Sequence, residues 1–327
     1  MPGSAALLGS AAFLWQADAY AGRMWPVDYG GTRWTLEARA RSLFGTVKVI
    51  RSGPLGPQGE FFRWYVQDGL VQNQIYSTGV SMSLYTYALE LFARAYRPGM
   101  RAALVLGLGA GVVPMRLAQR GIAVEAVEID PASLEVAHRY FGFDARRVTV
   151  RLADARTFLR RCNTAYDVIV VDLFHGDGVP EYLVTREFFR DLRHCLARHG
   201  VAVFNSFADL QHPRSYAHFL ATLATELPSV MVYRLDDKNT MQVNSFVIAA
   251  AEPLANPVAV DLADTPLEIS DKLTAILRNP RPLDQALLDG GRVMSDARNP
   301  VSGDIARAQL RYRQRLVREM PAAYLLD

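Results

Sequence analysis

The chain has 327 residues, of which 50% are hydrophobic and 21% are charged. This composition is typical of a folded protein of about two domains and excludes a disordered chain, collagen or a pure coiled coil. Its 36 basic and 33 acidic residues leave too small an excess to indicate a nucleic-acid-binding surface. Two cysteines, Cys162 and Cys195, exclude a disulfide framework and a four-cysteine zinc site, so we expect a cytoplasmic protein.

The first predicted segment, residues 1–30, is an extension that contains an apolar stretch at residues 4–15. This stretch is shorter than the roughly 20 apolar residues that cross a membrane. No Lys or Arg precedes it, so the charged start of a signal peptide is missing. We expect a short helix that packs on the core or on a partner chain, without firm membrane association. The alternative is the end of a membrane segment from a longer parent protein.

Residues 31–80 predict a small antiparallel β domain. They are rich in Thr, Val, Phe, Trp and Tyr, the residue types that favour strands. The glycine- and proline-rich stretch at residues 53–57 interrupts them and indicates a loop between strands.

Residues 81–252 alternate short apolar runs with helix-like stretches, which predicts a parallel sheet covered by helices on both faces. The runs are apolar almost without interruption, as is typical of strands buried on both sides. They lie at residues 103–106, 124–129, 148–152, 168–171 and 201–204.

Two further runs, residues 230–235 and 243–250, are separated by a link too short for a crossover helix, so they predict an antiparallel hairpin. A parallel sheet that ends in such a hairpin is the α/β arrangement of a class I methyltransferase-like (Rossmann-like) domain. Residues 253–327 predict a C-terminal helical tail broken by prolines and glycines.

Three successive strand ends carry residues suited to a nucleoside cofactor. Gly107, Gly109 and Gly111 follow the first strand, where glycines allow a sharp turn and a close approach to a ligand. Glu128 ends the second strand and can accept hydrogen bonds from a ribose diol, and Asp154 ends the third and can accept the adenine amino group. We therefore expect an S-adenosylmethionine-type cofactor; the alternative is a tight turn with two solvated acids. The loop lacks the last glycine of the dinucleotide fingerprint.

Asp172 ends the fourth strand and should point into the same crevice, where an acid can accept a proton from an amine nucleophile or orient it. The alternative is an acid that caps a loop. His175 and Asp177 lie in the glycine-rich loop that follows, which could close over the site. Each of these two residues either binds the acceptor or is ordinary loop polarity.

At this point residues 42–252 resemble the spermidine synthases, the polyamine aminopropyltransferases. The resemblance rests on residues 68–72 (DGLVQ), the glycine loop, residues 128–131 (EIDP), Asp154-Ala155, and residues 185–189 (TREFF). It implies that Asp172 is the catalytic acid and that Tyr85 lies near the sulfonium or the acceptor. The cofactor-binding residues would be Gln72, Gly107, Gly109, Gly111, Glu128, Asp154 and Ala155. Residues 295–300 (SDARNP) resemble the tail motif of a bacterial branch that is often fused to membrane segments.

The chain departs from this family at three positions. Ala110 replaces an acid that would hold the amino end of decarboxylated S-adenosylmethionine, which favours ordinary S-adenosylmethionine. His175 replaces the second diamine-binding acid, and Thr86 replaces a histidine next to Tyr85. The resemblance therefore does not extend to a full set of carboxylates for a diamine.

These observations predict a transferase that uses decarboxylated S-adenosylmethionine or S-adenosylmethionine to alkylate, and specifically to aminopropylate, a small amine acceptor. One alternative is an S-adenosylmethionine-dependent methyltransferase on the same scaffold. The other is a non-catalytic nucleoside-binding module that acts as a sensor or partner. We expect no metal, because the histidines show no metal-ligand spacing. We expect no nucleic-acid partner, and a homodimer is possible.

Overall fold

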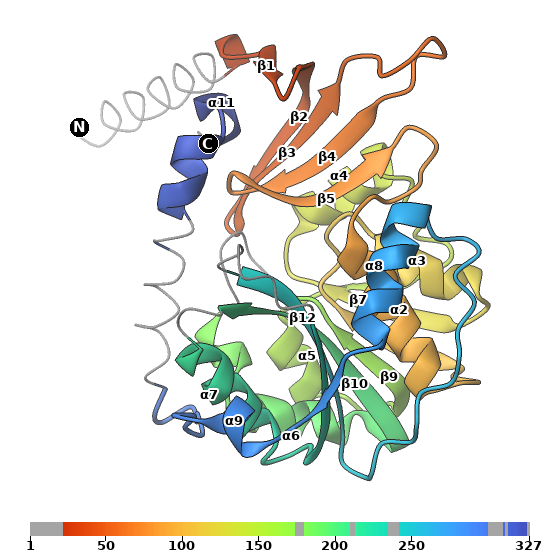
Figure 1. Ribbon diagram of the computed structural model, residues 1–327, viewed down its shortest axis with the longest axis vertical. Coiled ribbons are helices and arrows are strands. Elements are labelled where there is room, and N and C mark those ends of the chain that lie inside the picture. The colour runs from red at the N-terminus through yellow and green to blue at the C-terminus, as the bar shows by residue number, and fades with distance from the viewer. Residues whose placement is uncertain are drawn as a thin grey trace, which may run out of the picture.

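The computed structural model describes residues 22–173, 180–209, 213–234, 242–299, 310 and 313–325. The apolar stretch at residues 4–15 and the predicted acceptor-binding residues His175 and Asp177 lie outside this part of the chain. Two sheets and their covering helices make up the described structure (Figure 1).

The N-terminal sheet is a five-stranded antiparallel meander, as the strand-forming composition of this region predicts. Its third strand is buried on both faces. Val47 and Val49 pack with residues of α4 (Pro131–Tyr140) on one side, and Ile50 packs with Tyr324 of α11 (Ala322–Leu325) on the other. The strands are β1 (Val27–Tyr29), β2 (Thr32–Ser42), β3 (Gly45–Ser52), β4 (Phe62–Gln67) and β5 (Leu70–Tyr76).

The second sheet confirms the class I methyltransferase-like α/β fold. Five strands run parallel in the order β8-β7-β6-β9-β10, and β12 and β11 continue the sheet as the predicted antiparallel hairpin. A short strand, β13 (Pro280–Pro282), pairs with β11 from within the predicted helical tail. The other strands are β6 (Ala102–Leu106), β7 (Ala123–Glu128), β8 (Thr149–Leu152), β9 (Tyr166–Val171), β10 (Leu196–Asp209), β11 (Ser229–Arg234) and β12 (Gln242–Ala250).

Helices cover both faces of this sheet (Figure 1). Alternate residues of β9 point to opposite sides, so Val168 and Val170 join one core cluster while Ile169 and Val171 join the other. One face carries α2 (Leu84–Tyr96), α3 (Val112–Gln119), α4 (Pro131–Tyr140) and α8 (Leu267–Leu277). The other carries α5 (Ala155–Arg160), α6 (Arg186–His194), α7 (Arg214–Leu223) and α9 (Gln285–Leu288). The last described helix is α11 (Ala322–Leu325).

Two further features concern the expected lack of membrane association and the two cysteines. Within the described ranges, no helix is long and apolar enough to cross a membrane. Cys162 and Cys195 are joined as a disulfide, with their Cα atoms 5.9 Å apart, which connects the residues that follow α5 and α6.

Candidate active site

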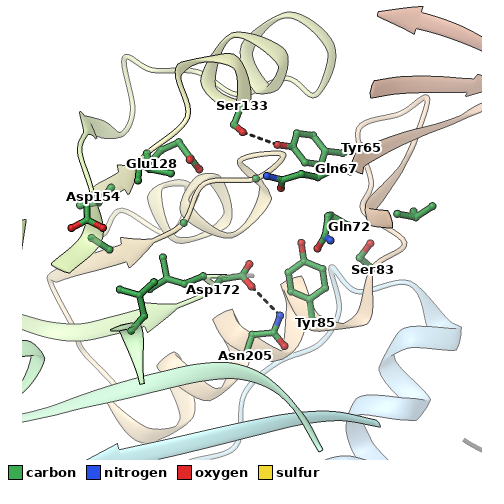
Figure 2. Close-up of a pocket in the computed structure, with 18 of the residues that line it drawn as sticks. Tyr65, Gln67, Gln72, Ser83, Tyr85, Glu128, Ser133, Asp154, Asp172 and Asn205 are labelled. Atoms are coloured by element: carbon green, nitrogen blue, oxygen red, sulfur yellow. Dashed lines mark hydrogen bonds between the residues drawn. The ribbon is translucent and has the colours of Figure 1, made fainter. Parts of the chain in front are cut away.

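A cavity of about 350 Å³ opens between the N-terminal sheet and the carboxyl ends of β6, β7 and β9. Open α/β sheets bind their ligands at this edge, and the volume is within the range of small-molecule sites. The cavity wall includes every predicted site residue that the structure describes except Gly111. These are Gln72, Tyr85, Gly107, Gly109, Glu128, Asp154, Ala155 and Asp172 (Figure 2 shows several of them).

Close packing and backbone conformation explain why this loop contains glycines. Gly107 has a φ of 93°, and a Cβ on it would lie 2.0 Å from the carbonyl oxygen of Asp172. Gly109 lines the cavity, and a Cβ there would meet nothing within 4 Å. Gly111 precedes α3 and packs against Phe143 at 2.6 Å from the position of a Cβ. The close approach at Gly111 therefore serves packing of the loop on Phe143.

The side chain of Ala110 does not face the cavity, although the family resemblance places an acid at this position beside the cofactor. Its side chain is buried in an apolar cluster with Val47, Tyr65 and Val136, and the described cavity wall does not include it. The expectation that this position faces the amino end of the cofactor is therefore not supported. A carboxylate here would be buried among apolar side chains instead.

Glu128 holds the glycine loop in place. Its carboxylate accepts hydrogen bonds from the backbone N–H of Leu108 at 3.0 Å and from that of Asp130 at 2.8 Å. The side chain is buried but lines the cavity. A carboxylate oxygen can accept more than one hydrogen bond, so a side chain that supports the loop can also accept from a ligand.

Asp154 caps α5, where one oxygen accepts the N–H of Thr157 at 2.7 Å and the other accepts the hydroxyl of Tyr182 at 3.1 Å. Tyr182 belongs to the short helical turn η1 (Glu181–Leu183) and also lines the cavity. This partner could not be found from the sequence, because the two residues are 28 positions apart and no motif connects them.

Asp296 and Asn299 of the tail motif hold this wall of the cavity. The guanidinium of Arg156 pairs with Asp296 and donates to the carbonyl oxygen of Tyr182 at 3.1 Å. The amide of Asn299 donates to the carbonyl oxygen of Glu181 at 2.8 Å. The tail motif thus holds the turn whose tyrosine contacts Asp154.

Asp172 is paired with a residue that the sequence analysis missed. The side-chain amide of Asn205 donates to Asp172 Oδ1 at 2.9 Å (Figure 2). The register pairs Phe204 of β10 with Val171 of β9. The residues that follow them, Asn205 and Asp172, therefore lie side by side at the cavity. A polar residue directly after the apolar run at residues 201–204 was the available signal.

Burial, and after it the charge of Glu128, raises the pKa of Asp172 to about 6, although the hydrogen bond from Asn205 lowers it. A carboxylate with a pKa near the working pH is suited to proton transfer.

Tyr85, from the first turn of α2, points toward the same space (Figure 2). Its hydroxyl accepts a hydrogen bond from Asn73 at 3.2 Å. Burial, and then the charge of Asp172, raises the pKa of Tyr85, so the phenol stays neutral and can donate.

The remaining polar wall comes from β4 and α4. The hydroxyls of Tyr65 and Ser133 lie 2.8 Å apart, and Gln67 of β4 is beside them (Figure 2). Burial raises the pKa of Tyr65. Among the described residues, no group of three or more His, Cys, Asp and Glu side chains is placed to hold a metal ion.

Comparison with known proteins identifies relatives of this chain. Residues 82–235 match the family model of the spermine/spermidine synthase domain. A polyamine aminopropyltransferase of Vibrio vulnificus is 37% identical over 140 residues, which cover 41% of this chain and 46% of that protein. An N-terminal histidine N-methyltransferase of Emericella nidulans is 35% identical over 137 residues, 40% of this chain and 24% of that protein.

Among solved structures, a probable spermidine synthase of Corynebacterium glutamicum has a TM-score of 0.62 at 18% identity, covering 79% of this chain and 96% of that one. This likeness supports the fold. The chain spans less than half the length of the two curated relatives. Both curated relatives named here are transferases, one of aminopropyl groups and one of methyl groups. Residues 82–235 therefore match the spermine/spermidine synthase domain, and the chain is similar in sequence to a polyamine aminopropyltransferase.

Proposed function

We propose that this protein is an N-alkyltransferase that moves an aminopropyl group from decarboxylated S-adenosylmethionine to a small amine. The observation that carries the proposal is the position of Asp172. Its carboxylate, whose pKa burial raises to about 6, shares one cavity with the glycine loop and Glu128. The cavity thus combines a proton acceptor with groups suited to an adenosyl cofactor.

The donor set fits such a cofactor. Gly109 leaves open space above the loop, and the Glu128 carboxylate at the cavity wall suits the two hydroxyls of a ribose. Asp154 stands at the next strand end, beside Tyr182, and suits the adenine amino group. Gln72 and Ala155 complete the wall around this space. When bound, the cofactor supplies a carbon activated by its neighbouring sulfonium.

The protein's own residues then orient and deprotonate the nucleophile. The amine lone pair attacks the activated carbon, a C–N bond forms, and the C–S bond breaks with its electron pair remaining on sulfur. Asp172 accepts the proton that the amine nitrogen loses. Tyr85, held by Asn73, offers a neutral hydroxyl beside this point. Fixing both reactants in one cavity supplies a large part of the rate enhancement.

The relatives support transfer to nitrogen, because a polyamine aminopropyltransferase and an N-terminal histidine N-methyltransferase both alkylate an amine-type nitrogen. Similarity to the second keeps methyl transfer from S-adenosylmethionine as the alternative function.

The by-product distinguishes these functions. Purified protein is incubated with each cofactor and a panel of amines, and the adenosyl by-product is identified by mass spectrometry. We expect methylthioadenosine, the by-product of aminopropyl transfer, whereas S-adenosylhomocysteine would show methyl transfer. Tight nucleoside binding without either by-product would contradict an enzyme and favour a sensor.

A further inference from the structure

Asn205 is a buried amide placed against Asp172 by the pairing of two parallel strands. It is 8% exposed and lines the cavity from β10. Its amide nitrogen donates to Asp172 Oδ1, while its own oxygen is buried and has no hydrogen-bond partner among the described residues. A buried unpartnered acceptor costs free energy, so the fold alone gives no reason for an amide at this position.

The amide can face an ionised Asp172 in one orientation only. An ionised carboxylate has no proton to donate and accepts hydrogen bonds at both oxygens. The nitrogen of Asn205 must therefore face Oδ1, as it does in the structure, and the second carboxylate oxygen lies on the side away from Asn205 (Figure 2). One oxygen is thus engaged by the protein, and the other remains for the nucleophile.

We propose that Asn205 is a positioning residue for the transfer reaction, which keeps Asp172 ionised and turns its Oδ2 toward the acceptor amine. This inference rests on the proposed function for its link to catalysis. The claim about ionisation concerns the protein alone. The charged or titratable groups that bear on Asp172 from neighbouring elements are Glu128 at the end of β7 and Tyr85 on α2.

Removing the amide should make Asp172 harder to ionise. A hydrogen bond to a charged group is worth roughly one to two pKa units. In Asn205→Leu, which is close in size but cannot donate, we expect the Asp172 midpoint to move from about 6 upward by about one to two pH units. The acid limb of kcat/KM should move by the same amount. In Asn205→Asp the added carboxylate should raise the Asp172 midpoint and the acid limb of kcat/KM further.

The test measures the carboxyl group directly and then turnover. Protein with 13C-labelled aspartate is titrated by NMR, and the Asp172 signal is assigned by its loss in Asp172→Asn. Asn244→Leu is the matched control, because Asn244 also lines the cavity but is not the hydrogen-bond donor to Asp172. It should leave the midpoint at the parent value. Asn205→Thr, whose hydroxyl can donate, serves if the leucine variant does not fold, and it should keep the midpoint closer to the parent than Asn205→Asp does.

An Asp172 midpoint that stays at the parent value in Asn205→Leu and Asn205→Asp would overturn the inference. A shifted carboxyl midpoint with an unmoved kcat/KM limb would also overturn it, because Asn205 would then not act through Asp172. A shifted midpoint in a protein that alkylates no amine would support the ionisation claim and reject the proposed function, so the two failures are distinguishable.

Discussion

Replacing Asp172 with asparagine should stabilise the fold above pH 6 while it removes the proton acceptor. The folded protein raises the pKa of Asp172 from 3.8 to about 6, mainly through burial. The folded state therefore binds more protons than the unfolded state between these pH values, and the parent loses stability as the pH rises through them. The asparagine variant does not titrate and avoids this loss.

The size of the effect follows from the shift. One pKa unit corresponds to about 1.4 kcal/mol, so a rise of about two units gives at most about 3 kcal/mol at pH 8. Well below pH 3.8 the carboxyl is neutral in both states, and at pH 4 most of the loss has not yet developed, so the two proteins should differ little there. Urea denaturation of parent and variant at pH 4, 6 and 8 measures this trend. Turnover at pH 8 should fall by roughly 10²–10⁴-fold because proton transfer is lost.

Asp167 on the same strand is the matched control. Burial alone would raise its pKa, but hydrogen bonds from the backbone of Arg101 and Ala102, with Arg97, outweigh burial and lower it. Its ionised form therefore stabilises the fold at neutral pH, and Asp167→Asn should lose stability where Asp172→Asn gains it. A stability difference for Asp172→Asn that is the same at pH 4 and pH 8 would refute the argument from burial.

Three further substitutions test the cavity and the residues packed around it. Glu128→Ala should weaken binding of an adenosyl nucleoside at least about tenfold, because a hydrogen bond to a charged group is worth roughly 1.5–3 kcal/mol; unchanged affinity by calorimetry would contradict the ribose placement. Ala110→Asp should destabilise the fold by more than about 2 kcal/mol, as a buried unpaired charge does, and a urea midpoint equal to the parent's would show that this position is not enclosed. Asp296→Ala leaves Arg156 without its carboxylate, so hydrogen exchange around Tyr182 should quicken; unchanged exchange would show that the tail motif does not hold this turn.

The parallel sheet could be predicted because its central strands are buried on both faces. Burial on both sides requires near-continuous apolar runs, and β9 shows this at Val168 and Val170 on one face and Ile169 and Val171 on the other. The hairpin of β11 and β12 could be predicted from the length of the link between them, because this link is too short for a crossover helix. The strand β13 was missed because Pro280–Pro282 has no strand-like composition.

The candidate site could be predicted where its residues lie at the ends of strands. Glu128, Asp154 and Asp172 all follow apolar runs, and all three line the cavity. Partners that come from other segments were not predictable. Asn205 meets Asp172 through the register of β9 and β10. Tyr182 reaches Asp154 from a turn that Arg156 and the tail residue Asn299 hold.

The expectation for Ala110 depends on treating a motif position as a position in space. Ala110 lies inside the glycine loop, but its side chain joins the cluster beneath the N-terminal sheet. A loop motif fixes the backbone path and leaves open which side chains face the ligand. His175 and Asp177 stay predictions for the acceptor.

The central claim is that one cavity holds the adenosyl cofactor with its sulfonium end at Asp172. A crystal structure of the protein with S-adenosylhomocysteine or methylthioadenosine tests it most directly. The account predicts both ribose hydroxyls within hydrogen-bond distance of the Glu128 carboxylate and the ligand sulfur on the side of Asp172 and Asn205. A nucleoside bound elsewhere, or bound here with its sulfur turned away from Asp172, would contradict the account.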